Sequence, residues 1–181
     1  MYIDSKTAEG QAVLEAARAM CAAARTAPKA CGTDELDTAI LTGEDKDALA
    51  TKMREIGTAL GDKGGFFIRD AGNVDESAAV VLIGAKYETR KLGKLCGLCG
   101  FDGCTECKRA GATCVFTPMD LGIALGSAVA VAADRRLDNR MMFTAGKAAD
   151  ALGMLGELGE RRMIIGIPLS ASGKSPYFDR K

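Results

Sequence analysis

The sequence contains no histidine and no tryptophan, and its 24 basic side chains are balanced by 24 acidic ones. Without histidine the chain cannot form a Cys/His zinc finger, a Rieske-type centre or a Ser-His-Asp triad. A net charge of zero provides no broad positive field for nucleic acid or an anionic membrane. Ligands for a metal must therefore be thiolates, carboxylates or backbone groups.

Signals for secretion or membrane insertion are also lacking. The first residues, Met1 to Gln11, are polar and acidic, without the basic flank and apolar core of a signal peptide. The most apolar run, Leu121 to Ala133, is too short to span a bilayer and is bracketed by Asp120 and Asp134. We expect a single cytoplasmic domain over residues 1–181, with its cysteines serving metal or redox chemistry instead of disulfides.

Hydrophobic periodicity predicts helices that alternate with a few short strands. Ala78 to Ala85 lacks alternation and is rich in branched residues, so it is the expected central strand, covered on both faces. Asp70 to Asp75 is typical of a turn, and Pro168 is expected to end the last strand. This pattern indicates an α/β (α+β) layered domain with a mixed sheet flanked by helices. The first expected helix starts at Asp4 or Ser5 and ends at Pro28. Further helices are expected over 42–60, starting at a capping box, over 118–135, and over 138–158 as a pair or one broken helix. The other expected strands are 36–41 and 163–167.

Five of the seven cysteines lie within nineteen residues, in the stretch CGLCGFDGCTECKRAGATC. Such short spacings allow one loop to fold several thiolates around a compact iron–sulfur cluster. Gly97, Gly100 and Gly103 permit the positive backbone dihedrals of a tight wrap. The five are Cys96, Cys99, Cys104, Cys107 and Cys114. The remaining two are interpreted as a core residue, Cys21, and a spare thiol, Cys31.

Other metal centres remain alternatives. Two cysteine pairs that bind structural zinc are normally separated by roughly fifteen residues or more, whereas only four residues separate Cys99 from Cys104. Cys99, Cys104 and Cys107 also fit the spacing of plant-type 2Fe-2S ferredoxins, but this choice leaves Cys96 without a role. A 4Fe-4S cluster with Cys96, Cys99 and Cys104 as ligands uses the glycines better, and its fourth ligand is Cys114 or Cys107.

The opening CGLCGFDGC resembles the small 4Fe-4S domain of iron–sulfur subunits of acetyl-CoA decarbonylase/synthase and of the Rnf electron-transfer complex. That domain takes its fourth cysteine from further downstream, so the resemblance favours Cys114 over Cys107. Together with the continuation CVFTPMDLGIALGSAVAVAADRRLDNRMMF, the chain is similar to a family of prokaryotic ferredoxin-domain-containing proteins. This resemblance implies cluster binding by residues 95–116.

A second resemblance is to the flavin-dependent nitroreductases, in residues 22–50, 120–133 and 165–180. It implies a nitroreductase-like layered fold, a homodimer packed through long central helices, and FMN at the subunit interface, with the cysteine segment as an insertion. Arg25 and Lys29 would then be candidate contacts for the FMN phosphate. Alternatively, these two cations complement the carbonyl end of the first helix.

Three functions follow from these patterns. The first is electron transfer or redox sensing by a 4Fe-4S protein. The second is a nitroreductase-like oxidoreductase in which the cluster feeds electrons to FMN, and the third is a structural zinc module. The basic stretch Lys86 to Lys94 suits a solvated loop, a set of cations that offset the thiolate charge, or a docking site for an acidic redox partner protein.

Overall fold

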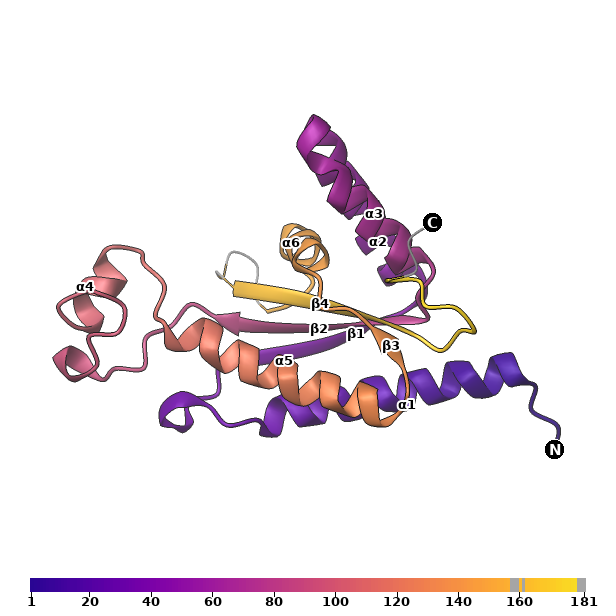
Figure 1. Cartoon of the computed structure of the whole chain (residues 1–181). Coiled ribbons are helices and arrows are strands. Elements are labelled where there is room, and N and C mark those ends of the chain that lie inside the picture. The colour runs from indigo at the N-terminus through magenta and orange to yellow at the C-terminus, as the bar shows by residue number, and fades with distance from the viewer. Residues whose placement is uncertain (157–159, 161, 179–181) are drawn as a thin grey trace.

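An antiparallel sheet lies between two layers of helices (Figure 1). The computed structural model describes residues 1–156, 160 and 162–178, and these residues form a four-stranded sheet in the order β1-β2-β4-β3. Helices α1 and α5 cover one face, and α2, α3 and α6 cover the other. The expected α+β layered architecture is confirmed. The strands are β1 (Leu36–Leu41), β2 (Ala79–Lys86), β3 (Asp138–Asn139) and β4 (Arg162–Ser170); the helices are α1 (Ser5–Thr26), α2 (Gly43–Ala59), α3 (Gly65–Asp75), α4 (Cys104–Arg109), α5 (Phe116–Asp134) and α6 (Phe143–Ala151).

Strand β2 forms the middle of the sheet and has apolar side chains on both faces. Val81 and Ile83 pack into the core beneath α1 and α5, whereas Val80 and Leu82 pack into the core beneath α2, α3 and α6. All four side chains are completely buried. Two covered faces explain why this stretch shows no hydrophobic alternation, and the predicted central strand is confirmed.

The sheet is antiparallel at each pairing of the described strands, whereas the sequence predicted a mixed sheet. A parallel pair needs a crossover connection, usually one helix. Here β1 and β2 are joined by the two helices α2 and α3, so the chain enters β2 in the opposite direction to β1.

The helix ends follow the expected signals in part. Asp4 caps α1 by accepting a hydrogen bond from the Thr7 amide at 2.9 Å. Pro118 lies in the first turn of α5, as predicted. Helix α2 begins directly after Thr42, but the Thr42 side chain makes no capping hydrogen bond, so the helix start is confirmed and the expected Thr42 cap is not.

Helix α3 occupies the segment for which the sequence predicted a turn. Its buried residues Phe67, Ala71 and Val74 recur at the spacing of one helix face. Asp70, which looked like a turn residue, is buried and accepts a 2.7 Å hydrogen bond from the Thr144 hydroxyl on α6. This partner lies 74 positions away in the sequence, so local reasoning could not find it.

The stretch 138–158 forms β3 and α6 instead of a helix pair or one broken helix, and its last two residues, 157 and 158, lie outside the described part of the chain. Gly146 is needed because a Cβ there would lie 1.8 Å from the Ile164 carbonyl oxygen, so α6 packs directly against β4.

Pro168 does not end β4, which continues to Ser170. Gly166 exchanges both backbone hydrogen bonds with Met142. Pro168 lies two residues after Gly166, so its nitrogen faces the same side of β4 as the Gly166 amide. On that side Pro168 lies opposite the gap between Met142 and the short β3, so the sheet loses no hydrogen bond there.

Helix α5 is long and apolar enough, by length and composition, to cross a membrane, a test that core helices of soluble proteins also pass. Its inner residues Leu121, Ala124 and Ala128 belong to the core shared with α1 and the sheet. Its outer face, which includes Met119 and Ile123, is exposed and apolar. The packing agrees with the predicted core helix and leaves one unpartnered face.

Candidate metal centre

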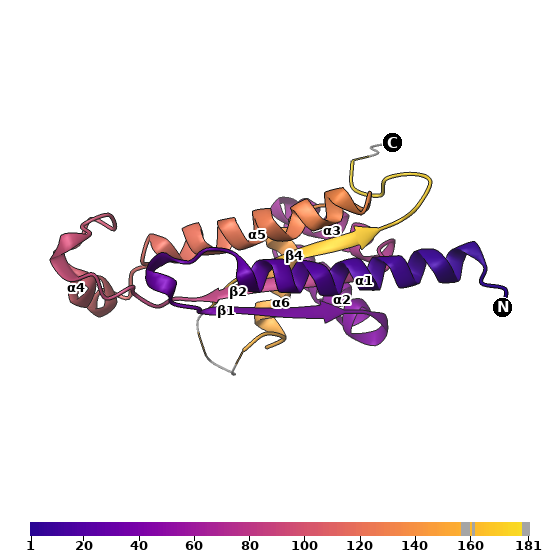
Figure 2. The same cartoon turned by 90° about the horizontal axis from the view of Figure 1, so that it is seen from below.

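The segment between β2 and α5, residues 87–115, projects beyond the end of the sheet and carries the short helix α4 (Figures 1 and 2). We call it the cysteine arm. The remaining helices and strands form what we call the layered body. None of the arm residues belongs to either hydrophobic core of the described chain. Its conformation therefore depends on turns and polar contacts.

All five clustered cysteines line one small cavity inside the arm. Cys107 and Cys114 are buried, whereas the other three thiols are half-buried. Among the described residues, no carboxylate side chain lines the cavity, and Thr89 and Arg90 are its polar members apart from the thiols. The structure thus brings together every sequence-predicted ligand and both candidates for the fourth one.

The glycines shape this wrap as the sequence predicted. Gly97, Gly100 and Gly103 have φ values of 60°, 78° and 93°, which side-chain-bearing residues rarely adopt. Gly103 is also a point of close approach, because a Cβ there would lie 3.3 Å from the backbone of Gly93 and Lys94. Directly after it, α4 carries Cys104 and Cys107 three residues apart, within one helical turn.

The thiols in this cavity affect one another. Burial raises the pKa of the Cys107 thiol, and a hydrogen bond with Cys99 raises it further. The nearby thiols of Cys114 and Cys104 act in the same direction. Because a metal binds the thiolate, loading this site releases protons, and the positive charge of the metal replaces them.

The donor set is of the kind that holds an iron–sulfur cluster. In the described part of the chain, no three Cys, Asp or Glu side chains converge on one metal-ion position. A 4Fe-4S cluster is held by four thiolates on four different irons and therefore accepts ligands spread around a larger space. Five thiols around one cavity, with no carboxylate among them, match that requirement.

A buried ion pair fastens the arm to the layered body. Arg90, in the arm, donates through Nε and Nη2 to one oxygen of Asp120 on α5, at 3.0 and 2.7 Å. The second oxygen of Asp120 accepts the Ala30 amide at 3.0 Å. The sequence showed Arg90 only as one member of a basic stretch and did not predict this pair. The available signal was an aspartate within an apolar helix, which must find a partner when it is buried.

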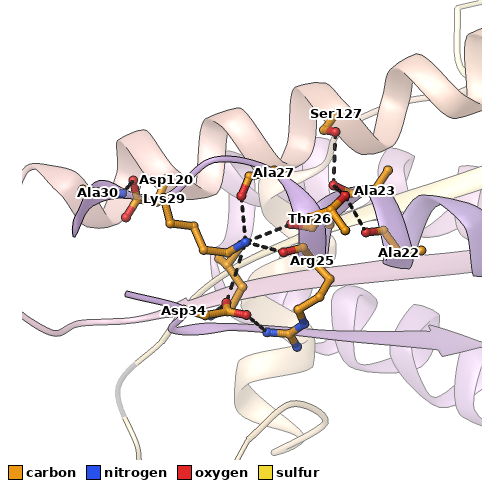
Figure 3. A network of polar contacts seen from close by, with 12 residues as sticks. Ala22, Ala23, Arg25, Thr26, Ala27, Lys29, Ala30, Asp34, Asp120 and Ser127 are labelled. Atoms are coloured by element: carbon orange, nitrogen blue, oxygen red, sulfur yellow. Dashed lines mark hydrogen bonds and ion pairs between the residues drawn. The ribbon is translucent and has the colours of Figure 1, made fainter. Parts of the chain in front are cut away.

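Arg25 and Lys29 lie at the carbonyl end of α1 (Figure 3). Arg25 Nη1 pairs with Asp34 at 2.6 Å, and the Lys29 ammonium donates to the carbonyl oxygens of Ala24, Arg25 and Ala27. Neither side chain lines the cysteine cavity. These contacts favour the helix-end interpretation of the two cations over phosphate binding.

The two other cysteines stay away from the cavity, as predicted. Cys21 packs against the core beneath α1 and α5, where burial raises the pKa of its thiol. Cys31 is exposed in the turn after α1. Cys31 therefore provides a cysteine control outside the candidate site.

Comparison with known proteins gives one relative over nearly the whole chain. An uncharacterized protein of Archaeoglobus fulgidus is 44% identical over 188 aligned positions, which cover 99% of this chain and 98% of the relative. Residues 110–180 match the family model described as uncharacterized proteins containing a ferredoxin domain. The chain belongs to this family. The matched range includes Cys114, while the other four cavity cysteines lie before it.

The fold of this ferredoxin-domain family member is similar to that of solved flavoproteins. A nitroreductase with bound FMN from Desulfitobacterium hafniense aligns with a TM-score of 0.58 and 15% identity, over 88% of this chain and 78% of that one. A BluB-like flavoprotein from Clostridium difficile aligns with a TM-score of 0.56 and 16% identity, over 96% and 87%. At these identities the likeness establishes a nitroreductase-like fold, which confirms the second resemblance at the level of architecture.

Proposed function

We propose that the protein binds a 4Fe-4S cluster in the cysteine arm and uses it for electron transfer or redox sensing in the cytoplasm. Cys96, Cys99, Cys104 and Cys114 are the proposed ligands, and Cys107 is the alternative fourth ligand. The observation that carries this proposal is the single cavity lined by all five thiols. Membership of a ferredoxin-domain family supports it.

The arm residues have distinct tasks in this proposal. The thiolates hold the irons, and Gly97, Gly100 and Gly103, with their positive φ values, let the loop wrap closely around them. When bound, such a cluster takes up and releases single electrons. The buried side of the cavity, at Cys107 and Cys114, excludes water, whereas the half-buried Cys96 and Cys99 lie on the side from which an electron can enter.

Metal analysis of anaerobically purified protein tests the proposal. Iron and acid-labile sulfide in equal amounts, with the electron paramagnetic resonance signal of a reduced cluster, are the expected result. Colourless protein with stoichiometric zinc would instead establish the structural zinc module.

Separate serine substitutions identify the fourth ligand. Cys114→Ser should abolish stable iron binding, while Cys107→Ser should keep it, with Cys31→Ser as the control for cysteine loss outside the cavity. The reverse pattern would make Cys107 the fourth ligand.

A second function is favoured by the fold, because solved structures with bound FMN have the same architecture. In this alternative the cluster feeds electrons to FMN bound at a subunit interface. Acid precipitation separates the two functions, since released flavin would fluoresce in the supernatant. To bind the FMN phosphate, Arg25 would compete with its pairing to Asp34, and Lys29 would have to leave the carbonyl oxygens at the end of α1.

We further infer that a second copy of the chain covers the outer face of α5. This face presents Met119, Gly122, Ile123 and Gly126 to solvent without a charge among them. Gly126→Arg has room in the single chain, because no atom lies within 4 Å of the added Cβ, and it should convert a dimer to a monomer in light scattering. Gly10→Arg on α1, which has equal room, is the control. A monomeric wild type would contradict the inference.

A further inference from the structure

Arg90 is a buried cation in the wall of the cysteine cavity. Its side chain is 2% exposed, and it lines the same space as the five thiols. Taking a guanidinium out of water costs several kcal/mol unless its charge and its N–H groups are satisfied. The contacts of Arg90 therefore indicate which charge and which hydrogen-bond acceptors a group bound in the cavity should have.

The contacts that Arg90 makes leave part of its donor capacity unused. Nε and Nη2 donate to Asp120, and Nη1 donates to the Glu88 carbonyl oxygen at 3.1 Å. A guanidinium carries five N–H groups. Three hydrogen bonds with the described residues leave two N–H groups, one on Nη1 and one on Nη2, in a buried side chain beside the thiols.

Asp120 fixes the orientation of this guanidinium. Its own side chain is 3% exposed and is anchored by the Ala30 amide on the opposite side. The Thr117 hydroxyl donates to the same Glu88 carbonyl at 3.4 Å. These contacts join the start of the arm to the start of α5, so the planar guanidinium of Arg90 is held in one orientation before any ligand binds.

We propose that Arg90 donates its two remaining N–H groups to the sulfur atoms of a cluster in this cavity, and that Asp120 is its positioning residue. This inference rests on the cluster binding proposed above. Reduction adds one electron from a low-potential one-electron donor, with no bond broken and no proton transferred. A fixed positive charge with donors directed at sulfur stabilises the more negative reduced form and so raises the reduction potential.

Redox titration of the anaerobic holoprotein tests this role with Arg90→Gln and the matched control Lys94→Gln. Both substitutions remove one positive charge from the arm, but Lys94 is 76% exposed and does not line the cavity. Arg90→Gln should lower the midpoint potential by at least the 59 mV that corresponds to a tenfold change in a one-electron equilibrium. Lys94→Gln should leave the potential unchanged because solvent screens its charge.

Arg90→Lys keeps the charge without the fork, and its midpoint potential should fall between those of the wild type and Arg90→Gln. If Arg90→Gln does not retain iron, the same titration on Arg90→Lys decides the question. Iron-loaded Arg90 variants with the wild-type potential, or an equal shift in Lys94→Gln, would overturn the inference. Wild-type protein without iron would instead overturn the proposed cluster.

Discussion

The layered body and the cysteine arm are stabilised in different ways. In the body, completely buried apolar side chains such as Leu82 and Ile83 pack on both faces of the sheet. In the arm, Leu95 and Leu98 are 89% and 63% exposed, and five thiols line the interior cavity. Apolar burial therefore stabilises the body, whereas the arm depends more on its ion pair with α5 and on the group that its cavity binds.

This difference separates architecture from chemistry. The body carries the nitroreductase-like fold, and the arm carries the residues that suit an iron–sulfur cluster. Arg90 and Asp120 connect the two regions, and changes on either side of this joint should have different consequences.

The largest stability effect is expected at the joint. Asp120→Asn leaves Arg90 buried without its counter-charge, and removal of one partner from a buried pair costs about 3–5 kcal/mol. Urea unfolding measures this loss. Asp102→Asn, which breaks the exposed pair of Lys94 and Asp102, is the control and should cost less than about 1 kcal/mol. Equal losses for the two variants would show that the joint is not a structural connection.

A core substitution in the body is expected to come next. Leu82→Ala removes a completely buried side chain from the middle of β2 and should destabilise the body by about 2–5 kcal/mol. Leu98→Ala, in the arm, should change the unfolding free energy by less than about 0.5 kcal/mol because Leu98 is exposed. Both values come from denaturant titration, and a comparable loss at Leu98 would mean that the arm has an apolar core after all.

The smallest effect concerns pH at the end of α1. Partial burial opposes ionisation of Asp34, but hydrogen bonds from Arg25 and the Leu36 amide, with the charges of Arg25 and Lys29, lower its pKa below 3.8. A lowered folded-state pKa contributes stability that is present above the unfolded pKa and is lost as the pH falls through the folded one. Because the pair is more than one-third exposed, solvent screening limits this contribution to less than about 1 kcal/mol.

Thermal unfolding of the wild type and Asp34→Asn across this pH range measures the Asp34 contribution. The two melting temperatures should differ at neutral pH and converge once Asp34 is protonated. A difference that stays constant with pH would assign the effect to packing, and the helix-end pairing at α1 would then contribute nothing electrostatic.

Much of the body could be predicted from the sequence because its signals are local. The apolar run over β2 indicated a strand with two covered faces, and Asp4 and Pro28 marked the limits of α1. The density of cysteines and the glycines between them predicted the site in the same way. Hydrophobic periodicity and cysteine spacing can both be recognised from a few neighbouring residues.

The features that escaped prediction depend on contacts between distant segments. Asp70 looked like a turn residue because its partner Thr144 lies on another helix. Pro168 continues a strand because its nitrogen faces a gap in the pairing with β3. The ion pair of Arg90 was not predicted because Asp120 is 30 positions away. In each case the deciding arrangement lies between segments that are distant in the sequence.

Iron and sulfide per chain, measured in anaerobically purified wild type, Cys104→Ser and Cys31→Ser, test the cluster proposal most directly. Cys104 lines the cavity and Cys31 does not, so the two variants each lose one cysteine, one inside the cavity and one outside it. We expect about four irons and four sulfides in the wild type and in Cys31→Ser, and almost none in Cys104→Ser. Iron-free wild type, or equal iron in all three proteins, would contradict a cluster held by the cysteine arm.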